Sequence, residues 1–210
     1  MIPLADASRR SVRFPVVTTL LIAANALVFM LELSLGDAFV GRWALVPTDI
    51  TAGRGLITLL SAMFLHAGWL HILGNMLFLW VFGPPIEEAM GQGRYLAFYL
   101  LGGLAASFAQ IVAAPGATLP NLGASGAIAA VMGAFLITYP ADRIRTVLLL
   151  GWFVMIRLVP AALLVGLWFL IQLFSEFGAL YGAQAGGVAY MAHLGGFVFG
   201  LVFARLFEAR

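Results

Sequence analysis

Residues 123–135 read Gly-Ala-Ser-Gly-Ala-Ile-Ala-Ala-Val-Met-Gly-Ala-Phe (GASGAIAAVMGAF), a serine between glycines followed by residues that suit a lipid bilayer. A serine hydroxyl becomes a nucleophile only beside a general base. Hydrolysis also needs water, which the hydrocarbon core of a membrane excludes. The function of Ser125 therefore depends on which side chains, and how much water, the rest of the chain brings to it.

The composition is that of an integral membrane protein. Of 210 residues, 63% are hydrophobic and 10% are charged, against roughly 25% charged in soluble domains. The length suits one compact domain. The chain has no cysteine, which excludes disulfides and thiolate metal sites. The net charge of +2 comes with arginines near the ends of apolar runs, which indicates membrane topology and not nucleic-acid binding.

The apolar runs predict an all-α polytopic membrane protein, a bundle of six transmembrane helices. About 20 apolar residues cross the hydrocarbon core. The first run is longer than the ~7–15 residues of a signal-peptide core, so we expect it to be a retained span. The bundle would occupy 14–206, between a cytoplasmic tail, 1–13, and a cytoplasmic C-terminus, 207–210. The predicted spans are 14–35, 67–83, 94–113, 124–139, 159–176 and 188–206.

The segment 146–175 is ambiguous, because it is almost continuously apolar and long for one span. Arg157 and Pro160 interrupt it, so it is either one span with an interfacial lead-in or two spans. Two spans would reverse the last helix and carry His193 to the face opposite Ser125. We therefore expect one span.

The arginines orient the predicted bundle. With both termini in the cytoplasm, only Arg42 and Arg54 lie outside, in the first loop. Such an asymmetry satisfies the positive-inside rule. The arginines expected on the cytoplasmic side are Arg9, Arg10, Arg13, Arg94, Arg143, Arg145, Arg205 and Arg210.

Polar side chains within the spans are candidates for function, because ionisable groups in a membrane are costly. His71 and Asn75 share one helical face, one turn apart. Ser125 opens a helix of about 15 residues, near 23 Å, too short to cross a ~30 Å core. The loop before it must dip into the membrane. We expect His71, Asn75, Ser125 and His193 to converge at one depth, in a pocket open to the outer side.

Small residues would allow the serine and histidine helices to touch. Gly196 and Gly200 follow His193 on one face, and the serine helix carries Gly126 and Gly133 in a similar stripe. Such stripes let membrane helices approach closely.

Each signal also has an ordinary structural explanation. Ser125 alone could be a helix cap, and a lone histidine, an asparagine or a G-x-x-x-G pair could be plain helix packing. A zinc site of His66, His71 and His193 is conceivable, although H-E-x-x-H is absent. A transporter would need acidic residues at the span centres, and a soluble-type nucleophile elbow would need G-x-S-x-G after a strand.

Taken together, these residues resemble the rhomboid intramembrane serine proteases, over about 47–206. The matching motifs are G-A-S-G at 123–126, A-H-L-G-G-F-V-F-G at 192–200, H-A-G-W-L-H-I-L-G-N-M at 66–76 and F-G-P-P-I-E-E-A-M-G at 82–91.

The resemblance implies a six-helix fold with a Ser–His dyad in a water-filled cavity. It assigns Ser125 as the nucleophile and His193 as the general base. It assigns His71 and Asn75 as oxyanion donors, beside the backbone N–H of Ser125. No metal or other cofactor is expected.

Other positions are assigned supporting roles by the same resemblance. His66 lies at the rim of the site, and Gly123 and Gly126 flank the nucleophile. Glu87 and Gly91 belong to a structural motif after the second span.

The chain departs from the family pattern in two places. Many members carry Trp-Arg before the first histidine, where this chain has Ile57 and Thr58, and Arg54 is a candidate substitute. Some members carry an aromatic residue one turn after the nucleophile, where this chain has Ala129. The support of the His193 ring is therefore left open.

The predicted function is an intramembrane serine endopeptidase that cleaves transmembrane segments of other proteins. The resemblance implies lateral substrate entry between the second and fifth spans. The alternative is a catalytically inactive scaffold that binds client helices. We expect a multi-pass protein of the bacterial inner membrane; the sequence does not identify the natural substrate, its cleavage site or the oligomeric state.

Overall fold

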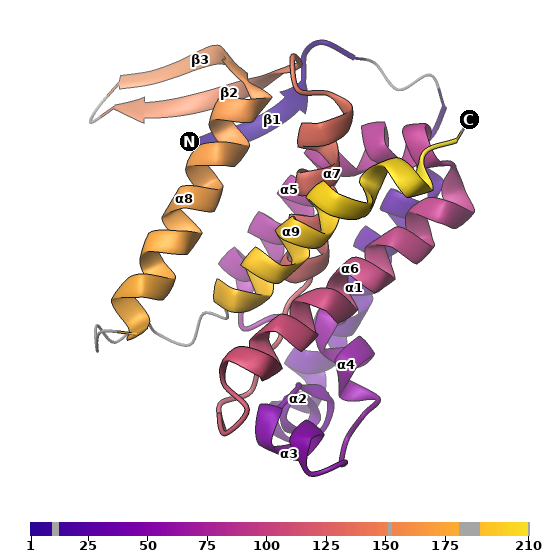
Figure 1. The fold of residues 1–210 in the computed structure, drawn as a ribbon, viewed down its shortest axis with the longest axis vertical. Helices are drawn as coiled ribbons and strands as arrows, with labels where there is room; N and C mark the ends of the chain where they lie inside the picture. Colours follow the sequence, from indigo (N-terminus) through magenta and orange to yellow (C-terminus); the bar gives the residue numbers. More distant parts are fainter. Residues whose placement is uncertain (10–12, 151–152, 181–189, 210) are drawn as a thin grey trace.

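Helices make up most of the chain, as its long apolar runs predict (Figure 1). The computed structural model describes residues 1–9, 13–150, 153–180 and 190–209. It describes their side chains as well, except at 149–150, 153 and 172–180. Its longer helices are α1 (Val16–Leu35), α5 (Trp69–Met90), α6 (Gln92–Ala113), α7 (Ser125–Thr138), α8 (Ala161–Leu180) and α9 (Tyr190–Phe207). The first loop contains α2 (Asp37–Trp43), α3 (Pro47–Thr51), α4 (Thr58–Ser61) and the 3-10 turn η1 (Ala62–Phe64).

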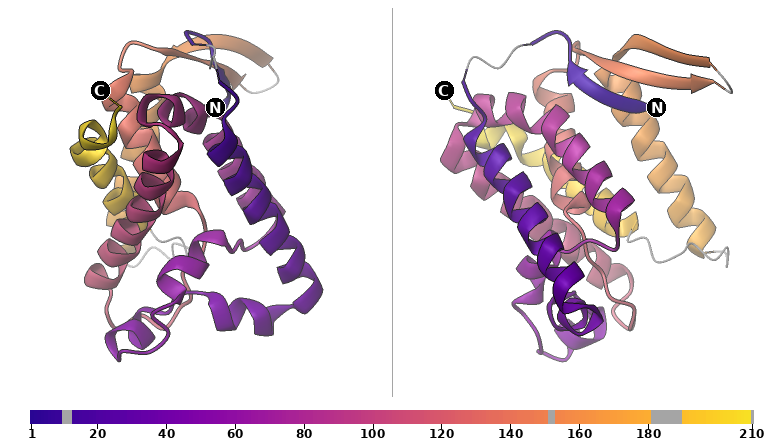
Figure 2. Two further views of the ribbon diagram at one scale, coloured as in Figure 1. Left: turned by 90° about the vertical axis from the view of Figure 1, so that its right-hand side faces the viewer. Right: turned by 180° about the vertical axis from the view of Figure 1, so that it is seen from behind.

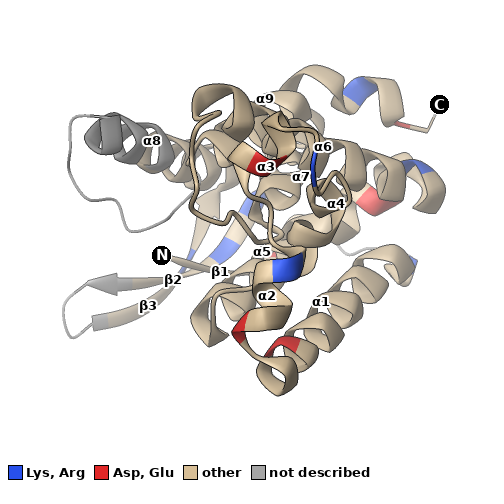
Figure 3. Cartoon of the chain, turned by 90° about the horizontal axis from the view of Figure 1, so that it is seen from below, with Lys and Arg blue, Asp and Glu red and all other residues tan. Residues whose placement is uncertain are grey.

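Four helices among the described residues are long and apolar enough to cross a membrane: α1, α5, α6 and α9. The helix α7 has 14 residues, and the part of α8 with described side chains, Ala161–Ile171, is also short. Charged side chains are sparse over the chain (Figure 3). The protein is thus a mostly helical membrane protein.

The short helix α7 lies at the centre of the bundle. Every residue from Gly126 to Phe135 is buried, and α7 packs against α5, α6 and α9. At about 1.5 Å per residue the helix is near 21 Å long, and the three residues just before Ala124, 121–123, are partly buried. The amide of Gly123 donates to the carbonyl of Ala62, and Leu45 pairs with Asn121, which fixes that loop.

The prediction of an all-helical protein was wrong at three segments. β1 (Ile2–Asp6), β2 (Arg143–Leu150) and β3 (Phe153–Pro160) form an antiparallel sheet in the order β1-β2-β3. Strand β2 alternates buried Ile144 and Thr146 with exposed Arg143 and Arg145, the period of two that a half-buried strand requires. The surrounding apolar residues conceal this alternation in the sequence.

The sheet also bears on two expectations about neighbouring segments. The N-terminal residues, predicted to be a tail, pair through β1, and Arg9 bonds to Asp142 with its guanidinium 3.8 Å from the Tyr139 ring centre. The lead-in to the fifth predicted span is the hairpin β2–β3, and a single helix, α8, follows it.

The two ends of the bundle differ (Figures 1 and 2). The sheet, with the end of α9, lies at one end, and α2, α3 and α4 lie at the other. Because α5, α7 and α9 run in one direction, their first turns lie towards the α2–α4 end. This arrangement brings residues near the starts of three helices together.

Glu87 and Gly91 shape the turn region at the sheet end of α5. The buried Glu87 carboxylate accepts hydrogen bonds of 2.8–2.9 Å from the Val17 amide and from the amide and hydroxyl of Thr18. A carboxylate there satisfies amides that lack partners in the first turn of α1. Gly91, at φ +78°, joins α5 to α6, and that conformation favours glycine.

Candidate active site

Glycines bring α7 and α9 into backbone contact. A Cβ atom added to Gly196 would overlap the carbonyl oxygen of Gly126, and one added to Gly200 would overlap that of Ala130. At Gly133 the obstacle is the carbonyl oxygen of Phe197. Larger side chains along this stripe would separate the two helices.

Ser125 and His193 meet across this contact. The serine Oγ lies 2.7 Å from the imidazole Nε2, within the range of a strong hydrogen bond. Ser125 is the first residue of α7, and His193 lies in the first turn of α9. In this arrangement an imidazole can accept the hydroxyl proton while the oxygen attacks a carbonyl.

His71 and Asn75 face the same region from one side of α5. The amide of Ala67 donates to Nδ1 of His71 over 3.3 Å, so in the neutral ring the proton sits on Nε2. The Asn75 side chain is 9% exposed, and its amide nitrogen is without a hydrogen-bond partner among the described residues. Both groups can therefore donate to a developing negative charge.

Gly123 sets the approach of the loop to His71. Its φ is +126°, a region that L-residues rarely adopt. A Cβ atom there would lie 2.9 Å from both Cε1 and Nε2 of His71. Only glycine leaves this imidazole where it is.

A cavity of about 660 Å³ lies over these groups. Its lining includes His71 and Asn75 of α5, Ser125 of α7, Trp168 of α8 and His193 of α9. Apolar residues such as Phe78 and Met132 complete much of the wall. The cavity is large enough for several residues of an extended peptide, and its polar groups gather near one hydroxyl.

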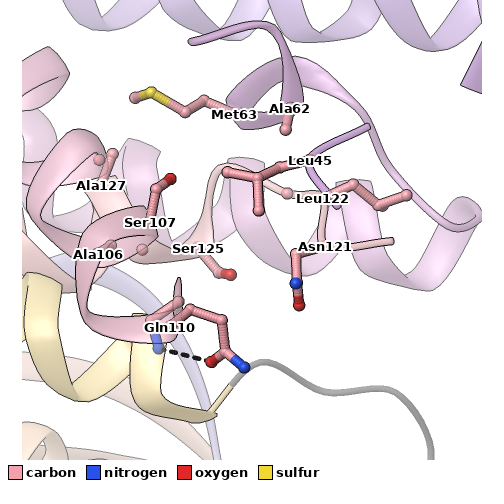
Figure 4. A pocket seen from close by; sticks show the side chains of 14 residues that line it. Leu45, Ala62, Met63, Ala106, Ser107, Gln110, Asn121, Leu122, Ser125 and Ala127 are labelled. Carbon is pink, nitrogen blue, oxygen red and sulfur yellow. Dashed lines mark hydrogen bonds between the residues drawn. The ribbon is translucent and has the colours of Figure 1, made fainter. Parts of the chain in front are cut away.

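A second, smaller cavity of about 40 Å³ lies behind the serine (Figure 4). Its polar lining comes from Ser107, Gln110, Asn121 and Ser125, and Oε1 of Gln110 accepts a 3.2 Å hydrogen bond from the amide of Ala192. A water molecule needs at least ~10–15 Å³ and two or more polar partners. This site can hold water next to the hydroxyl.

His66 lies beside His71, behind the cavity lining. Its ring is 5.1 Å from the ring of His71, and the residue is 2% exposed. Burial lowers the pKa of the His66 imidazole to about 4, which keeps the ring neutral at neutral pH. The His66 amide donates to both carboxylate oxygens of Glu32 over 3.1–3.2 Å. Sequence reasoning missed Glu32, although an acidic residue inside the first span was a signal.

The structure also bears on the two departures from the family pattern. Arg54 is exposed and pairs with Asp49, at the turn between α3 and α4. The ring of Trp168 lies 5.8 Å from that of His193, a contact that sequence reasoning missed. Ala129 is fully buried and contributes only a methyl group.

Metal-ligating side chains do not gather at this site. Within the described parts of the chain, no group of three or more His, Cys, Asp or Glu residues could hold an ion. The zinc alternative therefore has no support from the described geometry.

The fold and the site define a polytopic membrane protein with a Ser–His pair under an internal cavity. The chain belongs to the rhomboid family, since the family model described as "Rhomboid domain" matches residues 53–210. This range contains all four of the polar residues that the sequence predicts to converge.

Three relatives illustrate the similarity. Rhomboid protease GluP of Bacillus subtilis is 36% identical over 134 residues, 61% of this chain and 26% of that protein. The mitochondrial presenilin-associated rhomboid-like protein of Rattus norvegicus is 35% identical over 134 residues, 61% of this chain and 34% of that protein. Chloroplastic rhomboid-like protein 11 of Arabidopsis thaliana is 31% identical over 157 residues, covering 70% of this chain and 50% of the relative. The chain thus spans about a quarter to a half of these relatives.

Proposed function

We propose that this protein is an intramembrane serine endopeptidase that cleaves transmembrane segments of other proteins. The observation that carries the proposal is the 2.7 Å contact between Ser125 Oγ and His193 Nε2 under a cavity. Membership of the rhomboid family, whose matched relatives include a protein named a rhomboid protease, supports it. The four spanning helices, with α7 and α8, would make the six-helix bundle.

In the first half of the reaction, His193 takes the proton of Ser125 as the oxygen attacks a peptide carbonyl carbon. Negative charge develops on the carbonyl oxygen. The donors for it would be Nε2–H of His71, Nδ2–H of Asn75 and the Ser125 amide, one of the first-turn amides that lack an intrahelical partner. One such donor contributes roughly 10²–10³ in rate. His193 then protonates the leaving amine, and an acyl-serine remains.

In the second half, water attacks the acyl carbon while His193 again accepts a proton. The small cavity lined by Ser107, Gln110 and Asn121 would supply that water. Collapse of the second tetrahedral intermediate releases the carboxylic acid and returns the proton to Ser125 Oγ. No step requires a metal ion.

The substrate must reach the cavity with its backbone exposed. A helix hides its carbonyls in i→i−4 hydrogen bonds, so a transmembrane segment must unwind locally before Ser125 attacks. The cavity lining contributed by α5 and by Trp168 of α8 supports lateral entry between these two helices. Small and helix-weakening residues near the cut would favour cleavage.

The direct test is cleavage in lipid vesicles. The purified wild-type chain should cut a reconstituted transmembrane test substrate, and Ser125→Ala should not. Ser34→Ala, which alters an exposed hydroxyl on α1, is the matched control and should retain activity. Binding of the test substrate without cleavage by the wild type would favour the alternative, an inactive scaffold for client helices.

The location in a bacterial inner membrane, with both termini in the cytoplasm, stays a prediction. The names of two relatives place those proteins in mitochondria and chloroplasts.

A further inference from the structure

The indole of Trp168 is the ring that α8 places against the imidazole of His193. The two ring centres are 5.8 Å apart, with planes at 45°. The same indole lies 6.2 Å from the ring of Phe197, one turn further along α9. Trp168 thus bridges α8 to two successive turns of the histidine helix, while also lining the large cavity.

We propose that Trp168 is a positioning residue for His193, and that the docking of α8 helps to hold the imidazole in its reactive orientation. This inference rests on the proposed protease function and adds to it the residue that supports the general base. It also means that α8 supports the general base, in addition to bordering the path by which the substrate enters.

The first reason is geometric. The hydrogen bond between Ser125 and His193 acts at one edge of the imidazole. An aromatic contact at the ring restrains its tilt, and packing contacts of this kind hold a reactive group in place. One turn after the nucleophile, α7 offers only the buried methyl of Ala129. The tilted indole of Trp168 supplies an aromatic contact from the opposite element.

The second reason is electrostatic. The His193 ring becomes a cation as it takes the proton of Ser125. A cation within about 6 Å of an aromatic centre is attracted by the ring quadrupole, and tryptophan gives the strongest attraction. The contact should therefore be stronger in the transition state than in the resting pair, which is the condition for raising a rate.

The dependence on α8 follows from its packing. Phe169, the next residue, stacks on Phe197 with ring centres 4.6 Å apart and planes at 29°. Trp168 and Phe169 together dock this turn of α8 against α9. If a substrate passes between α5 and α8, the return of this turn to α9 restores the contact between Trp168 and His193.

The experiment compares the rates at which a small fluorophosphonate probe labels Ser125 in the wild type and in Trp168 variants. Labelling by such a probe does not require the passage of a transmembrane helix. Trp168→Ala should lower the limiting labelling rate at saturating probe by about tenfold, within the ~2- to 30-fold expected for a cation–π contact. The half-saturating probe concentration should change little. Trp168→Phe, which keeps a ring, should stay within about threefold of wild type.

Two further variants separate positioning from packing. Trp168→Leu keeps apolar bulk without an aromatic face and should be as slow as Trp168→Ala. Leu170→Ala shortens a half-exposed side chain on the same turn of α8 and should leave labelling near the wild-type rate. Melting temperatures in the same detergent or bilayer identify any variant that has lost its fold, and rates are compared per folded molecule.

The outcomes distinguish this inference from the proposed function. A wild type that is not labelled at Ser125 overturns both. The positioning role alone is overturned if the wild type is labelled and Trp168→Ala is labelled at the same rate. It is also overturned if Trp168→Ala cleaves a transmembrane substrate faster while its labelling is unchanged, which leaves Trp168 as an obstacle at the entrance. If Trp168→Leu and Trp168→Phe are labelled at equal rates, the contact acts through packing alone and not through the aromatic ring.

Discussion

Replacing Gly123 by alanine tests whether the loop before α7 sets the position of His71. The new Cβ would lie 2.9 Å from Cε1 and Nε2 of the imidazole, whereas non-bonded carbon atoms prefer about 3.5–4.0 Å. The ring must therefore retreat by roughly 0.6 Å or more. A donor displaced that far from an oxyanion lengthens its hydrogen bond from ~2.9 Å to ~3.5 Å, where little of it remains.

The expected result is a loss of about 10²–10³ in cleavage rate, the effect of removing one oxyanion donor. The residue's φ of +126° adds a strain of roughly 1–3 kcal/mol to the folded state. Both are measured on one preparation, by turnover of a transmembrane test substrate in vesicles and by thermal unfolding.

Gly53→Ala separates these two effects. Gly53 has φ +73°, and a Cβ there would meet none of the described atoms within 4 Å. This control should lose about 1–2 kcal/mol through left-handed strain while keeping its turnover per folded molecule. If Gly123→Ala turns over as fast as Gly53→Ala, the proposed link between the loop and His71 is refuted.

Three more changes test other parts of the structure. Asn75→Ala should lower kcat by about 10²–10³ with little change in KM, because it removes a donor that the proposed mechanism uses in the transition state; a change in KM alone would assign Asn75 to substrate binding. Glu87→Gln should lower the free energy of unfolding by about 1–3 kcal/mol, because a charged acceptor of three hydrogen bonds is lost; fluorophosphonate labelling per folded molecule should not change, and an unchanged unfolding temperature would contradict the capping role. Gly200→Ala should destabilise the fold by about 1–3 kcal/mol through overlap with the Ala130 carbonyl, whereas Gly166→Ala on α8, where a Cβ meets none of the described atoms within 4 Å, should not; equal stability of the two variants would contradict the close contact of α7 and α9.

The polar residues of the site could be located from the sequence because a membrane constrains depth and direction strongly. An apolar run defines a helix, its length defines how far it reaches, and alternation of direction defines which ends are neighbours. Those rules bring His71, Ser125 and His193 to one level, and the 2.7 Å contact between the last two agrees with that expectation. Glycines at 196 and 200 indicate how closely the helices approach.

The sheet could not be predicted by the same rules. In β2 and β3 almost every position is apolar or arginine, so the period of two is hidden in a long apolar run. Strand pairing also depends on a partner elsewhere in the chain, here Ile2–Asp6. Propensity within a single segment contains no information about that partner.

The contact between Trp168 and His193 was beyond sequence reasoning for a related reason. Trp168 lies in a helix rich in apolar residues, and the helical period alone does not indicate which residue meets a given side chain of α9. The contact depends on the angle and height at which α8 docks. Glu32 differs, because one carboxylate within the first span was visible in the sequence and only its partner, the His66 amide, was not.

The central claim is that the hydroxyl of Ser125 is activated by the imidazole of His193. The most direct measurement is labelling of the chain by a fluorophosphonate probe in lipid bilayers, followed by identification of the modified residue by peptide mass analysis. The account predicts modification of Ser125 in the wild type and none in His193→Ala. An unmodified wild type, or modification of Ser125 at an undiminished rate in His193→Ala, would contradict it.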